Sequence, residues 1–368
     1  MRNKTAAAFL AAILCAGALG GCQSPMQEVV VESSQPETLE ITQEVEEKEE
    51  EEVFYHPLTG EAVTEEEASV RPVSFIINNS QKAWPQCGIS QADVVYEWPY
   101  EGTATRLMAV FSDPTKAETI GPLRSARHDF VELSMPLHTI FVHWGGSKPG
   151  YAALSDYDIE NVDGMTGYDC FFRDQDRLNA GTALEHTAMV DTEKLMTQIE
   201  TLGYAQDEAI EPAYQFNTEE EPLVFEDKQA KDVTVKISGE TTCNLVYDEE
   251  TKTYAKYEYG QQQIDANNDE PVALDNVFIL YAQISSYDGV NVWRDLKLET
   301  GGSGYYLTQG TKTPITWKKD DANAGIVYTK ETGDELTVNP GNSWVIFAEN
   351  GAETSWTSGE EAETTAEE

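Results

Sequence analysis

Short apolar runs bounded by polar or turn residues recur through the first half of the chain, at 73–77, 94–98, 107–111 and 139–144. Runs of this length, rich in β-branched and aromatic residues, are typical of buried strands. The sequence therefore predicts four strands before residue 145.

Two segments of the same half show helical spacing instead. Leu195, Ile199 and Leu202 recur one helical turn apart, between an N-capping Asp191 and a terminal Gly203. Residues 130–137 predict a shorter helix, which the proline at position 136 prevents from continuing. Strands that alternate with helices predict a mixed α/β domain over residues 54–204.

The hydrophobic period changes to two in the second half of the chain. Segments such as 233–237, 254–259 and 277–283 are short and separated by Asp, Gly and Asn turns, which predicts an all-β domain over residues 223–350. Residues 205–222 between the two domains are rich in Asp, Glu and Pro, a composition typical of an interdomain linker.

The N-terminus has the features of an export signal. Arg2 and Lys4 precede an apolar run, and the sequence Leu19-Gly20-Gly21-Cys22 resembles the bacterial lipobox, in which the cysteine is lipidated. We expect a signal peptide over residues 1–21 and a lipid on Cys22; the alternative is an ordinary secretory signal with a chance cysteine. Because no other apolar run is long enough to span a bilayer, the expected location is the cell membrane, lipid-anchored and facing the extracytoplasmic side.

Acidic residues concentrate at the two ends. Residues 28–52 hold eleven Glu against one Lys, and residues 349–368 hold seven Glu. These compositions predict a disordered acidic tether at 22–53 and a disordered tail at 351–368. The formal net charge of −42 argues against nucleic acid and against adsorption to anionic lipid headgroups as partners.

The cations are divided unevenly between the two predicted domains. Residues 54–203 contain six Arg and four Lys, whereas residues 204–368 contain one Arg and ten Lys. Guanidinium groups bind carboxylates and phosphates through a planar fork and tolerate burial. We therefore expect an anion site in the first domain. Its expected residues are Arg106, Arg124, Arg127, Arg173 and Arg177, with His143 nearby. An internal ion-pair network is the alternative, because acidic residues outnumber basic ones in the same segment.

Catalytic and metal-binding motifs are incomplete. The sequence Gly145-Gly146-Ser147-Lys148-Pro149 lacks the final glycine of a nucleophile elbow, and no HExxH, CxxC or P-loop occurs. No metal and no cofactor are expected. A binding protein is favoured over an enzyme.

Two other function classes stay open. In one, the first domain is a cell-envelope hydrolase or transferase that uses His143 or His186 as the base and Asp174 or Cys170 as its partner. In the other, the β domain docks a membrane protein, although the sequence identifies no such partner. Cys87, Cys170 and Cys243 remain once Cys15 and Cys22 are set aside, and this odd number does not indicate a disulfide framework.

Several motifs together resemble the YerB-like family of bacterial lipoproteins, a two-domain family of unknown function. The likeness covers most of residues 56–347. It rests on Pro57-Leu58-Thr59-Gly60, Arg71-Pro72-Val73, Ala92-Asp93-Val94-Val95-Tyr96-Glu97, Glu101-Gly102, Thr105-Arg106, 120–127, His143, Gly145-Gly146-Ser147, Phe172-Arg173-Asp174, Arg177, Trp317-Lys318-Lys319 and 336–341. The resemblance implies a mixed α/β first domain, a β-rich second domain and lipid attachment.

The chain departs from that family at two places. It carries Asn78-Asn79 where the family carries Asp-Asn, and it replaces a Pro-His-Asn element with a longer segment, 178–187, in which His186 is the single histidine. These departures weaken a catalytic interpretation. The hypothesis that emerges is an extracytoplasmic lipoprotein that binds an anionic small molecule, of cell-wall or glycan origin, in its first domain.

Overall fold

The computed structural model describes residues 53–357, except 103, 227, 240 and 288–289. The expected signal peptide, the lipidation site Cys22, nearly all of the tether and the end of the tail lie outside these residues. Within them, a twelve-stranded sheet forms the centre of the fold. Its main strands are, in spatial order, β22 (Val327–Lys330), β21 (Thr311–Lys318), β20 (Gly302–Thr308), β17 (Asn276–Ala282), β24 (Ser343–Glu349), β4 (Val94–Glu101), β5 (Ala104–Phe111), β3 (Val73–Asn78), β7 (Ile140–His143) and β8 (Asn161–Asp163).

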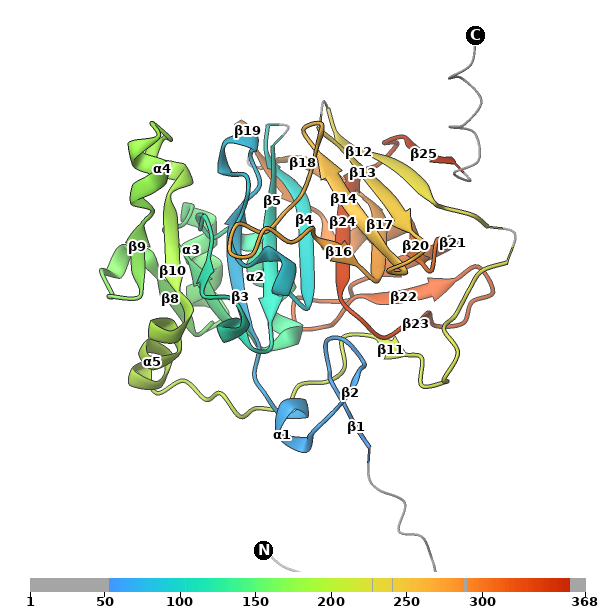
Figure 1. Cartoon of the computed structure of the whole chain (residues 1–368), viewed down its shortest axis with the longest axis horizontal. Helices are drawn as coiled ribbons and strands as arrows, with labels where there is room; N and C mark the ends of the chain where they lie inside the picture. Colours follow the sequence, from blue (N-terminus) through green and yellow to red (C-terminus); the bar gives the residue numbers. More distant parts are fainter. Residues whose placement is uncertain (1–52, 103, 227, 240, 288–289, 358–368) are drawn as a thin grey trace, which may run out of the picture. The chain divides into compact units, whose positions relative to one another are not determined.

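The large sheet contains strands from both halves of the chain. Strand β24 lies between β17 and β4 and pairs in parallel with each, so that Trp344 is opposite Val277 on one side and Val95 on the other (Figure 1). Strands β18 (Ile284–Tyr287) and β19 (Val290–Leu296) form a hairpin that joins β4 through Trp293 and Glu101. The two predicted domains therefore share one continuous sheet.

Helices cover one part of one face of this sheet. The helices α2 (His128–Ser134) and α3 (Lys148–Asp156) contact each other, and Phe130 and Leu154 lie in the same apolar cluster as Ile76 and Met108. Helix α2 ends at Ser134, and the chain then forms a single tighter turn, η4 (Met135–Leu137), which contains Pro136. The end of the helix at this proline agrees with the sequence prediction.

The opposite face is covered by α5 and by a second sheet. Helix α5 (Thr192–Leu202) has Asp191 as N-cap and a left-handed Gly203 at its end, which confirms the prediction from its helical spacing. The second sheet is all antiparallel. Its strands are β15 (Gln261–Gln262), β14 (Thr253–Glu258), β13 (Thr241–Asp248), β12 (Asp232–Ser238), β25 (Thr354–Thr357) and β16 (Ala273–Leu274).

Small elements complete the described part of the chain. Three further small sheets are present, together with helices α1 (Glu65–Ala68) and α4 (Gln175–Asn179). The sheets pair β1 (Phe54–Tyr55) with β2 (Ala62–Val63), β10 (Ala188–Asp191) with β6 (Thr119–Ile120) and β9 (Phe171–Arg173), and β11 (Gln215–Phe216) with β23 (Thr337–Val338). None of the helices in the described ranges combines the length and apolar character needed to cross a bilayer.

The predicted fold class is confirmed: helices and strands mix up to residue 204, and strands dominate from residue 232 onwards. Two details lie outside the expected division. Strand β11 and the buried Tyr214 fall within 205–222, the segment expected to link the domains, and β25 lies beyond residue 350, the expected end of the second domain.

Candidate functional site

The segment that carries Arg124 and Arg127 crosses the carboxyl ends of two parallel strands, β3 and β7. The amide of Arg124 donates to the carbonyl of Ile76 at 2.8 Å, and the amide of Trp144 donates to the carbonyl of Arg124 at 2.9 Å. The amide of Ala126 donates to Gly145 at 2.9 Å. These bonds place the two arginines at the edge where ligands bind in many sheets with parallel strands.

Arg106 approaches the same place from β5. In the sheet, the backbone of Arg106 lies opposite Asn78 of β3 on one side and Trp98 of β4 on the other. The side chain of Arg106 is fully buried. Its Nη1 donates to the carbonyl of Ser125 at 3.1 Å, and its guanidinium lies 3.5 Å from the centre of the Tyr100 ring. Within the described part of the chain, its Nε and Nη2 have no hydrogen-bond partner. A buried cation with two unused donors is costly unless an anion binds it.

Arg127 and Arg124 add further positive charge near this buried group, and Arg173 adds positive charge near Arg124. Arg127 Nη1 donates to the carbonyl of Ala126 at 3.0 Å, and the Arg127 guanidinium lies 5.5 Å from the Tyr100 ring centre. The Arg173 guanidinium lies 4.2 Å from the Trp144 ring centre. Arg124 Nη1 donates to the carbonyl of Glu185 at 3.2 Å and lies 3.9 Å from the Glu185 carboxylate, a long ion pair. Arg124 Nε is buried without a partner among the described residues.

Burial and neighbouring positive charge lower the pKa values of Arg106, Arg127 and Arg173. The pKa of Arg106 is lowered to about 9, first by burial and then by the charges of Arg127 and Arg124, while Tyr100 and Glu101 act in the opposite direction. Burial also lowers the pKa of Arg127 and of Arg173, and the charge of Arg124 contributes to both shifts. Arg124 is therefore the common neighbour of the other three.

The remaining arginines of the described chain are paired with carboxylates. Arg71 forms an ion pair with Glu160, and Arg294 forms one with Glu349. Arg177 Nε lies 3.1 Å from Asp174 Oδ2, and its terminal nitrogens donate to the carbonyls of Ala83 and Pro85. Arg177 thus ties α4 to residues 83–85 and has few free donors, in contrast to Arg106.

The histidines occupy different environments. His143 is fully buried; its Nδ1 is 2.7 Å from the carbonyl oxygen of Gly145, and its Nε2 is 3.2 Å from Asn161 Oδ1. His186 lies closer to the arginines. Its Nδ1 accepts a hydrogen bond from Asn78 Nδ2 at 2.8 Å, and Asn78 is the strand neighbour of Arg106. Asn78 therefore orients His186. Burial lowers the pKa of His186 most, and the charge of Arg124 lowers it as well.

The proposed catalytic partners make contacts elsewhere. Asp174 caps α4 by accepting from the amides of Asp176 and Arg177, both at 3.0 Å, and it forms the ion pair with Arg177. Both ring nitrogens of His143 are engaged by other groups. Burial raises the pKa of Cys170 to about 11, which favours the unreactive thiol. The role of these residues stays a prediction.

Two polar features were missed by sequence reasoning. The first is a network between the two large sheets. Lys256 Nζ lies 3.3 Å from Glu97 Oε2 and 2.8 Å from Glu258 Oε2, and all three side chains are buried. Asn79 Nδ2 donates to both glutamates, and Trp344 Nε1 donates to Glu97. The alternating burial of β14 shows that Lys256 and Glu258 face inward, whereas polar residues at these positions of the sequence predict an exposed face.

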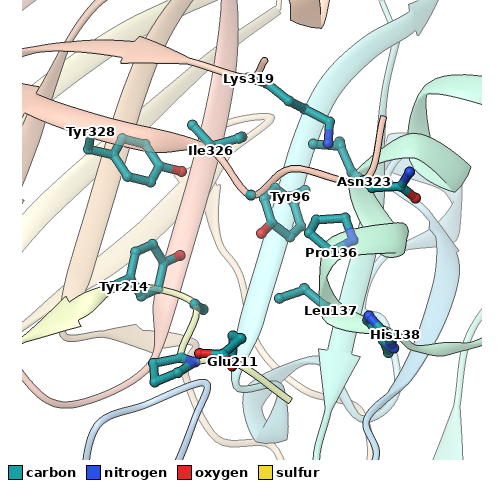
Figure 2. A pocket seen from close by; sticks show the side chains of 14 residues that line it. Tyr96, Pro136, Leu137, His138, Glu211, Tyr214, Lys319, Asn323, Ile326 and Tyr328 are labelled. Atoms are coloured by element: carbon teal, nitrogen blue, oxygen red, sulfur yellow. The ribbon is translucent and has the colours of Figure 1, made fainter. Parts of the chain in front are cut away.

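The second feature is a pocket of about 310 Å³ beside β4. The hydroxyl groups of Tyr214 and Tyr328 point into it, and Tyr96 contributes part of its wall (Figure 2). Burial raises the pKa of all three tyrosines, whereas it lowers the pKa of Lys319, another lining residue, to about 8. The pocket could hydrogen-bond a small polar molecule, and no motif in the sequence indicates it.

Comparison with known proteins identifies relatives for most of the chain. Residues 58–205 match the N-terminal domain, and residues 233–345 the C-terminal domain, of the protein family of unknown function DUF3048. The chain is 32% identical over 300 residues to YerB of Bacillus subtilis (strain 168), named as a candidate lipoprotein; the match covers 78% of this chain and 84% of YerB. The crystal structure of YerB superposes with a TM-score of 0.72 at 29% identity, covering 82% of this chain and 99% of the other.

Proposed function

We propose a ligand-binding function for this chain, which belongs to the DUF3048 family, the family of the Bacillus subtilis protein YerB. The proposed activity is the binding of an anionic small molecule by Arg106, Arg124 and Arg127. The protein would act as a lipoprotein, held by a lipid on Cys22 on the extracytoplasmic side of the membrane. The lipoprotein designation of YerB and the lipobox-like sequence at Cys22 support this anchoring.

A single observation carries the binding proposal: Arg106 is fully buried, with two guanidinium nitrogens lacking a hydrogen-bond partner within the described ranges. In a protein of net charge −42, carboxylates are abundant, and Arg71, Arg177 and Arg294 are each paired with one. Among the described residues, Arg106 and Arg127 form no such ion pair. An internal ion-pair network, the alternative to a site, would place carboxylates within ion-pair distance of these two groups, whereas Glu101 acts on them only from farther away.

The ligand class follows from the donors. Guanidinium groups bind carboxylates and phosphates through two parallel hydrogen bonds, and these hydrogen bonds are stronger where water is excluded. The aromatic ring of Tyr100 holds the Arg106 guanidinium in place, and this limits the entropy lost when a ligand binds. A phosphorylated sugar or a carboxylate-bearing cell-wall fragment fits both the donors and the expected location.

The proposal is tested by ligand-dependent thermal shifts of the detergent-solubilised full chain. The probes are inorganic phosphate, glucosamine 6-phosphate, citrate and a set of muropeptides. We expect at least one probe to raise the melting temperature of the wild type. Arg127→Ala should weaken its binding roughly ten- to hundredfold, the cost of one charge-assisted hydrogen bond.

Arg294→Ala is the matched control, because it removes the same charge from an arginine paired with Glu349. It should leave the affinity for the probe unchanged. The absence of a shift with every probe, or an equal loss of affinity in both variants, would contradict an anion site at Arg127.

A further inference from the structure

Three potential metal ligands from distant parts of the sequence meet at the start of α2. His128 and Asp129 are the first two residues of that helix, and Asp295 lies near the end of β19. His128 Nε2 is 3.2 Å from Asp129 Oδ1 and 3.3 Å from Asp295 Oδ1. One ligand atom from each residue lies within 4.8 Å of the other two. A single ion could therefore contact all three side chains.

Hydrogen bonds do not satisfy this cluster. Asp129 is 2% exposed; its Oδ1 accepts from the amide of Leu296 at 3.1 Å, and its Oδ2 has no partner among the described residues. His128 Nε2 carries at most one hydrogen, which cannot serve two carboxylates equally well. A buried carboxylate oxygen without a partner is costly and indicates a missing positive charge or donor.

A neighbouring lysine fixes the position of one of these carboxylates. Lys297 Nζ lies 2.6 Å from Asp295 Oδ2 and so engages the oxygen that does not face His128. Lys297 would hold the Asp295 carboxylate in the orientation of a ligand.

We infer that His128, Asp129 and Asp295 bind one divalent transition-metal ion of the Zn²⁺ or Mn²⁺ class. The His128 nitrogen lies 3.2 and 3.3 Å from the two carboxylate oxygens, and atoms about 3.0–3.4 Å apart can belong to one coordination shell when metal–ligand bonds are about 2.0–2.2 Å long. An imidazole nitrogen with two carboxylate oxygens suits these ions, whereas Ca²⁺ takes six to eight oxygen ligands. The expectation from sequence motifs, that the chain holds no metal, did not consider ligands so far apart in the chain.

Such an ion would connect the two family regions. Helix α2 belongs to the region 58–205, and β19 belongs to the region 233–345. The ion would also fix the start of α2, directly after Arg127. Its role would therefore be structural, and its binding is a separate question from the binding of an anion.

Calorimetric titration of the full chain tests the inference. The protein is solubilised in detergent, stripped with EDTA, dialysed and titrated separately with ZnCl₂ and MnCl₂. We expect one of the two ions to bind with a stoichiometry of one per chain and to raise the melting temperature. His128→Gln and Asp295→Asn should each weaken binding at least roughly tenfold, since the loss of even outer ligand partners has this effect.

Lys318→Met is the control, because Lys318 pairs with Asp320 and contacts none of the three ligands; its affinity should equal that of the wild type. Far-UV circular dichroism establishes that each variant is folded. If the wild type binds neither ion, the inference is wrong. Binding that neither ligand variant weakens would place the ion elsewhere, for example on the acidic termini, and would also overturn the inference.

Discussion

Arg106 is unusual because its burial destabilises the protein without an anion and strengthens the binding of an anion. Its guanidinium is enclosed beside Tyr100, and burial together with two neighbouring arginines lowers its pKa to about 9. Without an anion, the folded state carries the desolvation cost of this charge. With an anion, the same burial strengthens the interaction, because the surroundings have a low dielectric constant.

Arg106→Met should therefore stabilise the protein in the absence of an anion while weakening the binding of one. We expect the free energy of unfolding to increase on the order of 1–2 kcal/mol, because an apolar side chain replaces a buried, incompletely paired cation. Urea unfolding of wild type and variant measures this difference, and thermal shifts with the probe measure binding. If the variant is instead destabilised by several kcal/mol, Arg106 is a structural residue and the proposed site loses its central group.

At the scale of the elements, the position of α3 controls the arginine-bearing segment. A Cβ atom at Gly150, near the start of α3, would lie 2.5 Å from the carbonyl oxygen of Ala126 and 3.2 Å from the Cα of Arg127. Glycine allows the helix to approach this backbone closely. Ser147 caps the helix by accepting from the amide of Gly150, so the cap and the contact are coupled.

Gly150→Ala should push α3 away from residues 126–127. We expect a loss of about 1–3 kcal/mol in the free energy of unfolding, as is typical of overpacked sites, together with weaker anion binding because Arg127 is displaced. Gly325→Ala is the control, since a Cβ there meets no atom within 4 Å. Denaturation curves and probe titrations of both variants test this. Unchanged binding in Gly150→Ala would separate Arg127 from the position of α3.

The elements that the sequence predicts well are those whose pattern is local. Helix α5 follows from its helical spacing and its two caps, and β7 matches the apolar run before Trp144. Helix α3 was missed, because Gly145, Gly146 and Pro149 indicate a turn, although Pro is favourable in the first turn of a helix. Residue counts predicted a cluster of five arginines with His143 nearby; the charges of Arg124 and Arg127 act on Arg106, whereas Arg177 pairs with Asp174. The stacking of Arg106 on Tyr100 depends on the register of β4 and β5, which the counts do not contain.

At the scale of the whole described region, two family regions behave as parts of one structure. The pairing of β24 with β4 could not be predicted from the sequence, because parallel strands so far apart in the chain leave no local pattern. Strand β4 contains the apolar run predicted at 94–98, and β24 is apolar over 344–348 and lies in the predicted β domain, so the sequence assigns the two strands to separate domains. The domain boundaries therefore describe the sequence families better than they describe the packing.

Because Lys256 connects the two sheets, its loss should destabilise both family regions together. In Lys256→Met, the buried Glu97 and Glu258 lose their shared cation, at a cost of roughly 3–5 kcal/mol.

The same network makes the stability of the wild type depend on pH. Burial raises the pKa of Glu258 to about 7, so this carboxylate can take up a proton on mild acidification. The folded state then binds more protons than the unfolded state between about pH 4.5 and 7, and stability in this window falls as the pH rises.

Hydrogen exchange followed by mass spectrometry, over a urea series at pH 7, distinguishes a shared fold from two independent domains. Peptides from β4 and β5 and peptides from β13 and β14 should report the same free energy of unfolding in the wild type. Both should lose the same amount in Lys256→Met. Lys236→Met, on the exposed side of β12, should change neither. A loss confined to β13 and β14 would mean that the shared sheet does not couple the two regions, because one could then unfold while β4 and β5 stayed protected.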